Sequence, residues 1–212
     1  MSVSGRRIFL AGSLAAVGAA LVAPAARAAG EAPAVAPISA LYAGLLTVMK
    51  EGHATPFPQR FATLTPMVDR AFDLPGILRT SVGLLWPGLP QAQKARLQTV
   101  FRSFTIATYA ANFDSYSGER FTIAPALRAV GAERVVETHI VPASGGPTRI
   151  DYVMRPEAGA WKAVDVLLDG TISRVAVQRS DFRSALADGD ASRLIALLAR
   201  KTAQLSGGTV RP

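Results

Sequence analysis

The spacing of apolar residues changes twice along this chain, and these changes are the strongest constraint on its fold. Over residues 38–114, apolar side chains recur three and four positions apart, which is typical of amphipathic helices. Over residues 117–178 they alternate with polar ones, which is typical of antiparallel strands, and helical spacing returns from 180 to 205. This order predicts an α+β fold with a twisted antiparallel sheet of about four strands packed against N- and C-terminal helices.

Within the helical parts, the spacing predicts helices over 38–50, 60–72, 75–85, 91–114, 180–187 and 190–205. The clearest is 91–114, where Leu97, Val100, Phe101 and Phe104 share one side. A second apolar row widens this side to a broad arc. We therefore expect this helix to be covered by other elements on more than one side.

Within the alternating part, we expect strands over 133–141, 149–155, 161–168 and 172–178, with turns at 157–159 and 169–170. The third strand should place Val164, Val166 and Leu168 on one face. Two interpretations remain open. Either one face packs on helices while the other is partly open, or the sheet curves around a cavity beneath the long helix.

The start of the chain predicts export from the cytoplasm. Residues 1–28 combine a basic head, an apolar run and a small-residue exit, as a secretory signal peptide does, and Arg6-Arg7 resembles the twin-arginine signal. Residues 29–37 are rich in Ala and Pro and predict an extended tether. A single domain should then occupy 38–206, with a short tail at 207–212.

Composition excludes several kinds of chemistry. The 212 residues include no cysteine and only two histidines, and the formal net charge of +8 forms no basic stripe of the kind that binds nucleic acid. No metal-ligand spacing, nucleophile elbow or phosphate-binding glycine loop is present, so we expect no cofactor and no metal. Asp165 stands in an apolar strand, and we expect Arg149, Arg174 or Arg179 to pair with it.

A series of landmarks between residues 60 and 201 follows the order and spacing of a known family. The most specific run from Trp161 to Val166 and from Asp169 to Ser173. Others are Arg60-Phe61, Val68 to Asp73, Trp86, Gln93, Phe101, Phe104, Tyr109, Tyr116 to Glu119, Val135 to Thr138, Ile150 to Tyr152, Arg179 to Phe182 and Leu194 to Leu198. With these landmarks the chain resembles the MlaC family of periplasmic phospholipid-binding proteins, also called toluene-tolerance auxiliary proteins.

Two departures from the family pattern point to a divergent branch. Asp169-Gly170 replaces the usual Glu-Gly, and residues 83–90 are richer in proline and leucine than usual. They favour the HpnM-type branch, which is associated with hopanoid lipids.

The resemblance implies an NTF2-like or cystatin-like architecture with an apolar cavity that holds the hydrocarbon part of a lipid and leaves the head group at the mouth. It also implies a monomer that works with an inner-membrane complex of MCE and ABC-type subunits and with an outer-membrane lipoprotein complex. The residues we expect to line the lipid-binding cavity are Trp86, Phe101, Phe104, Tyr109, Phe113, Tyr152, Met154, Val164, Val166, Leu168, Ile172 and Val175.

Two functions from different classes follow. The first is a soluble periplasmic carrier that shuttles phospholipid or hopanoid between the two membranes and is not an enzyme. The alternative is an NTF2-like isomerase or hydrolase acting on an apolar substrate, with Asp165 or His139 as its base.

Overall fold

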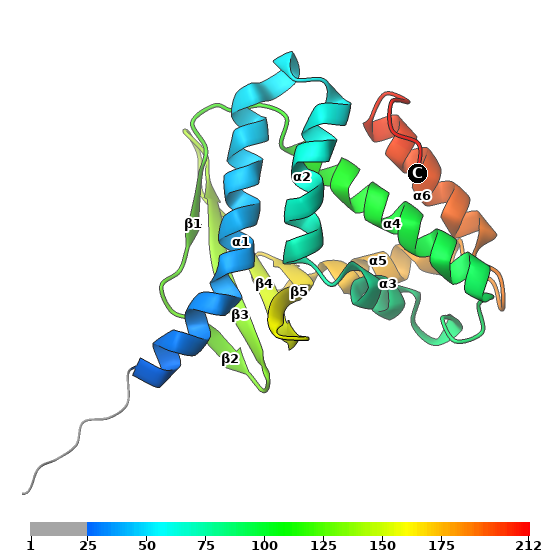
Figure 1. Cartoon of the computed structure of the whole chain (residues 1–212), viewed down its shortest axis with the longest axis horizontal. Coiled ribbons are helices and arrows are strands. Elements are labelled where there is room, and N and C mark those ends of the chain that lie inside the picture. Colours follow the sequence, from blue (N-terminus) through cyan, green and yellow to red (C-terminus); the bar gives the residue numbers. More distant parts are fainter. Residues whose placement is uncertain (1–24) are drawn as a thin grey trace, which may run out of the picture.

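An antiparallel sheet lies against helices in the computed structural model, which describes residues 25–212 (Figure 1). The predicted signal peptide lies outside the described residues except for 25–28. The helices are α1 (Ala25–Glu51), α2 (Phe57–Ala71), α3 (Leu74–Val82), α4 (Gln91–Asn112), α5 (Arg174–Arg183) and α6 (Ser192–Leu205), with 3₁₀ turns at Gly52–Ala54 and Gly83–Leu85.

The sheet runs in the order β1-β3-β4-β5-β6, and the short strand β2 also pairs with β3. All pairings between these strands are antiparallel. The strands are β1 (Arg120–Ile123), β2 (Arg128–Val130), β3 (Glu133–Val141), β4 (Thr148–Glu157), β5 (Ala160–Leu168) and β6 (Ile172–Ser173). The predicted α+β class and antiparallel sheet are confirmed. The long strands β3, β4 and β5 match the predicted ones closely, whereas β1 and β2 were not recognised as strands.

Helix α1 provides much of the core. Leu41, Leu45 and Val48 are fully buried, and the helix contacts β3, β4 and β5 as well as α2 (Figure 1). The segment Pro33–Ala54 is long and apolar enough to cross a membrane by length and composition. In this fold its apolar side is packed against the sheet, so the same residues serve as the core of the domain.

The expectation of an extended segment over 29–37 is wrong for the conformation of these residues. They belong to α1, which continues through Pro33 and Pro37. A proline inside a helix removes a backbone hydrogen bond and costs about 3 kcal/mol. Burial of Ala34 and Ile38 favours the helical path, because both side chains are fully enclosed in the core. Tertiary packing therefore outweighs the local preference of the prolines.

The predicted fourth long strand is also wrong. Only Ile172 and Ser173 pair with β5, and the chain then enters α5 at Arg174. Ser173 is the N-cap residue, because its hydroxyl accepts a hydrogen bond from the Ala176 backbone N–H. The helix predicted over 180–187 therefore begins earlier, at Arg174, and ends at Arg183. Consequently, the side chains after residue 173 project from a helix that packs on α3 and β5.

Arg60 links α2 to the end of α4. Its charged side chain is almost completely buried. Its Nη1 donates to the Ala110 carbonyl oxygen at 2.6 Å, and its Nε donates to the Thr55 carbonyl oxygen at 3.2 Å. Ala110 lies in the last turn of α4, where carbonyl groups lack helical partners and a positive charge is favourable.

We expect Arg60→Met to lower the free energy of unfolding by about 2 kcal/mol, because it leaves buried carbonyl oxygens without donors. Urea denaturation followed by circular dichroism measures the change. The control is Arg70→Met on the same helix, where the side chain is exposed and the loss should stay below about 0.5 kcal/mol. Equal losses in both variants would contradict the assigned role of Arg60.

Candidate functional site

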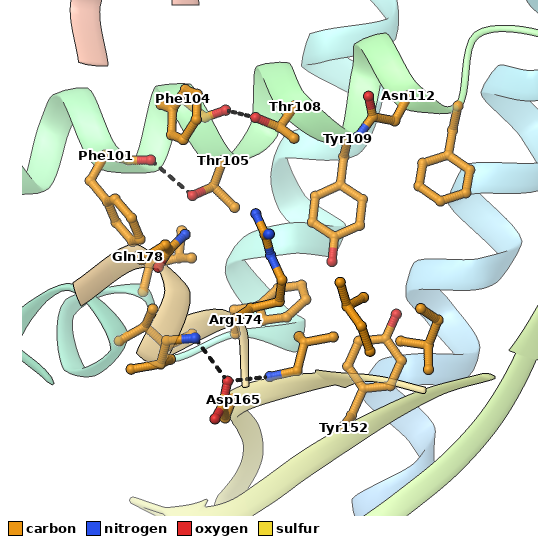
Figure 2. A pocket seen from close by; sticks show the side chains of 18 of the residues that line it. Phe101, Phe104, Thr105, Thr108, Tyr109, Asn112, Tyr152, Asp165, Arg174 and Gln178 are labelled. Carbon is orange, nitrogen blue, oxygen red and sulfur yellow. Dashed lines mark hydrogen bonds between the residues drawn. The ribbon is translucent and has the colours of Figure 1, made fainter. Parts of the chain in front are cut away.

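A cavity of about 430 Å³ lies between α4 and the helix-covered face of the sheet. Helix α4 forms one wall, β4 and β5 form the opposite wall, and α1, α3 and α5 contribute the remaining sides. Figure 2 shows side chains from α4 and from the sheet pointing toward one another across this space. This volume falls within the range of about 300–1,000 Å³ that is common for small-molecule sites.

Helical spacing explains the α4 wall. Its cavity-lining residues follow the steps of three and four that place side chains on one side of a helix. They are Phe101, Phe104, Thr105, Thr108, Tyr109 and Asn112. The stripe is aromatic at one end and more polar along its middle. It lies next to the fully buried row of Leu97 and Val100, which packs in the core.

Most of the residues predicted from the sequence are brought together by the structure. Those that line this cavity are Phe101, Phe104, Tyr109, Phe113, Tyr152, Val166, Leu168 and Val175. They come from α4, the segment after it, β4, β5 and α5. That these residues contact a ligand is a prediction, which lipid binding by variants tests.

Val164 does not line the cavity, because a β-bulge reverses the side-chain alternation in β5. Val153 pairs with Asp165 and Met154 pairs with Ala163, so Val164 has no partner of its own in β4. Beyond the bulge, Val166 faces the cavity, whereas Val164 lines a separate hollow of about 580 Å³. That hollow has charged walls that include Arg79, Glu133 and Arg155.

Trp86, Met154 and Ile172 also lie away from the cavity. Met154 is fully buried in the core, and Trp86 packs against the core after the 3₁₀ turn that follows α3. Ile172 is about half exposed in the short strand β6. The structure therefore places these three residues in packing or surface positions.

Asp165 belongs to β5 and lies beside the start of α5, where its carboxylate accepts three hydrogen bonds. Oδ1 accepts from the backbone N–H groups of Val166 at 2.7 Å and Val175 at 3.1 Å, and Oδ2 accepts from the Ser173 hydroxyl at 2.5 Å. The expected ion pair with Arg149, Arg174 or Arg179 is not formed, since none of the salt bridges among the side chains of residues 33–212 involves Asp165. Backbone and hydroxyl donors satisfy the carboxylate instead.

His139 does not reach the cavity. Its neighbours in β3, Thr138 and Ile140, point toward the helices, so His139 points to the opposite face. Its Nε2 lies 3.9 Å from a Glu137 carboxylate oxygen. In the part of the chain that the structure describes, no group of three or more His, Asp or Glu side chains is placed to hold a metal ion.

Three tyrosines bring hydroxyl groups into an otherwise apolar interior. Tyr42 and Tyr152 are almost fully buried, whereas Tyr109 is half-buried. All three line the cavity. The Tyr42 hydroxyl bonds to the Thr138 hydroxyl at 2.5 Å. Burial raises the pKa of Tyr109 and Tyr152 well above the ordinary value for a phenol, so both stay protonated at neutral pH.

The mouth of the cavity is marked by Asn112 and Arg174, which are exposed, while Phe72 and Tyr152 at the inner end are buried. Neither of these two mouth residues was among those predicted to line the cavity. Asn112 continues the α4 stripe at the expected spacing and was recognisable from it. Arg174 was not predicted to line the cavity, because its segment was predicted to be a strand and is the start of α5.

Residues 40–200 of this chain match the family model described as "MlaC protein". The chain belongs to the MlaC family. Its fold is similar to that of a phospholipid-binding protein from Ralstonia solanacearum, whose structure contains a phospholipid, with a TM-score of 0.69 and 20% sequence identity. The match covers 82% of this chain and 98% of the Ralstonia chain. No curated protein matches this MlaC family member.

Proposed function

We propose that this protein binds a membrane lipid by its hydrocarbon part in the cavity beneath α4. The observation that carries the proposal is the cavity itself, with aromatic and aliphatic side chains on its inner walls and polar residues at its mouth. Membership of the MlaC family supports it, and so does the phospholipid in the structurally similar Ralstonia protein.

Energetics explain why such a cavity suits a carrier. Each methylene group left in water costs about 0.8 kcal/mol, so a 16-carbon chain costs on the order of 12 kcal/mol. Free lipid therefore crosses an aqueous compartment very slowly. A preformed cavity with largely apolar walls removes most of this cost and requires no chemical step. We infer that the protein is a carrier and not an enzyme.

The proposed setting is the periplasm, where the protein receives lipid from one membrane complex and delivers it to another. The partners we propose are an inner-membrane complex with MCE and ABC-type subunits and an outer-membrane lipoprotein complex, and we propose that the carrier is a monomer. The family assignment and the signal-peptide pattern of residues 1–28 support this setting. Both phospholipid and hopanoid remain candidate cargoes for this function.

The enzymatic alternative lacks a suitably placed base. His139 faces away from the cavity, and the Asp165 carboxylate is engaged by three hydrogen-bond donors. The phenols of Tyr109 and Tyr152 stay protonated because burial raises their pKa. None of these groups is prepared to remove a proton from an apolar substrate.

The direct test is mass spectrometry of an organic extract of the purified protein. We expect roughly one lipid per protein chain, because a largely apolar cavity retains a hydrocarbon chain through purification. Delipidated protein should regain lipid when it is mixed with vesicles made from total bacterial lipid. A protein that purifies without lipid and takes none from vesicles would overturn the proposal.

A further inference from the structure

Two charged side chains line the cavity within the described part of the chain, and their surroundings differ. Asp165 is saturated by the three donors described above. Arg174 forms no salt bridge with any side chain from residue 33 to residue 212. A guanidinium group without a carboxylate partner at the edge of an apolar cavity is available to bind an anion.

The direction of the Arg174 side chain favours a ligand inside the mouth. Figure 2 shows its guanidinium group extending from the start of α5 toward α4, away from the Asp165 carboxylate. Thr105 and Thr108 lie on the α4 side of this space, but their hydroxyl hydrogens are donated to the carbonyl oxygens of Phe101 and Phe104. These two hydroxyl groups are therefore not free to donate a hydrogen bond to a ligand.

Tyr109 provides a second donor beside the guanidinium group. Its hydroxyl points from α4 into the same space (Figure 2). Burial raises the pKa of Tyr109, the nearby phenol of Tyr42 raises it further, and the positive charge of Arg174 acts in the opposite direction. Tyr109 therefore keeps its proton at neutral pH, and it lies close enough to Arg174 for the positive charge to affect its pKa.

The buried tyrosines behind Tyr109 have a fixed direction of hydrogen bonding. The Thr138 hydroxyl donates to the Ile150 carbonyl oxygen at 2.6 Å, so Tyr42 must donate its own hydrogen to Thr138. The Tyr42 oxygen can then only accept, and the neighbouring Tyr152 hydroxyl can donate to it. The single hydroxyl hydrogen of Tyr109 can be donated either to the Tyr152 oxygen or to a ligand. A bound anion is the stronger acceptor of the two, so it receives this hydrogen.

We propose that Arg174 and Tyr109 form a subsite for the acidic group of the bound lipid, a phosphate or a carboxylate. This inference rests on the proposed function and adds selection by charge to it. The guanidinium fork matches the oxygen geometry of either group, and the phenol supplies one more donor. The site disfavours lipids whose only polar group is an uncharged hydroxyl, so it discriminates against a neutral cargo.

The test uses pairs of lipids with identical hydrocarbon parts. Delipidated protein is incubated with phosphatidylcholine vesicles that contain equal amounts of phosphatidate and diacylglycerol, or of palmitate and hexadecanol. The protein is then separated from the vesicles, and its lipids are quantified by mass spectrometry. We expect an uptake ratio of acidic to neutral lipid of about ten in at least one pair. The pair that shows the preference identifies phosphate or carboxylate as the ligand group.

In Arg174→Gln the ratio should fall by about tenfold, and in Tyr109→Phe by about threefold, because the phenylalanine ring keeps the packing and removes the donor. Arg183→Gln is the matched control, since Arg183 is exposed on the same helix and does not line the cavity. It should keep the preference of the unmodified protein. Thermal unfolding verifies that all three variants are folded.

The outcomes separate this inference from the proposed function. If the protein takes up both members of each pair equally, or if Arg174→Gln retains the preference, the acidic subsite is wrong while lipid binding stands. If no variant takes up any lipid, including the unmodified protein, both proposals fail.

Discussion

Val166→Trp should purify with about tenfold less lipid than the unmodified protein, while its circular dichroism spectrum stays close to native. Val166 lies opposite Tyr152 in the sheet and lines the cavity, where it is only half-buried because it faces the open space. A tryptophan at this position projects into volume that the hydrocarbon would occupy. Mass spectrometry of the organic extract, normalised to protein, measures the loss.

Val164→Trp is the matched control on the same strand. The bulge turns Val164 to the other side of the sheet, toward the charged hollow, which has room for a larger side chain. We expect lipid content within about twofold of the unmodified protein, because no cavity volume is lost. If the Val166 variant is folded and keeps its lipid, Val166 does not border the binding site. If the Val164 variant loses lipid equally, the loss does not come from filling the cavity.

The contrast between these two valines shows what the sequence can and cannot predict. Strict alternation places Val164 and Val166 on one face, and the strand boundaries deduced from alternation agree closely with β5. A bulge adds one residue without changing the apolar pattern, so it reverses the faces without any signal in the sequence. The α4 residues were predictable because nothing interrupts the helical period between Phe101 and Tyr109.

The segment after residue 172 shows a second limit. Val175 and Val177 alternate as in a strand, whereas Ile172 and Val175 are spaced as in a helix, and such short runs are ambiguous. The N-cap at Ser173 and the carboxylate of Asp165, eight residues earlier, favour the helix. This long-range contact is invisible in a local pattern. Because a strand was predicted here, the position of Arg174 at the mouth of the cavity was not predicted.

Asp165→Ala should lower the free energy of unfolding by about 3 kcal/mol and also reduce the lipid content. The carboxylate accepts hydrogen bonds from the backbone of Val166 and Val175 and from the Ser173 hydroxyl. Alanine leaves these donors without partners and releases the start of α5 from β5. Because α5 carries Arg174 and Gln178 on the cavity wall, its displacement changes the mouth as well as the stability.

Asp165→Asn separates the hydrogen bonds accepted by the carboxylate from its negative charge. The asparagine oxygen can still accept from the two backbone N–H groups, so we expect a loss of only about 1 kcal/mol and retention of bound lipid. Asp181→Ala, an exposed position on the same helix, should change stability by less than about 0.5 kcal/mol. Urea denaturation and lipid quantification are applied to all three variants. An Asp165→Ala protein as stable as the Asp181 control would show that the carboxylate does not hold α5 in place. If Asp165→Asn lost lipid as completely as Asp165→Ala, the negative charge itself, and not the hydrogen bonds to α5, would be what the cavity requires.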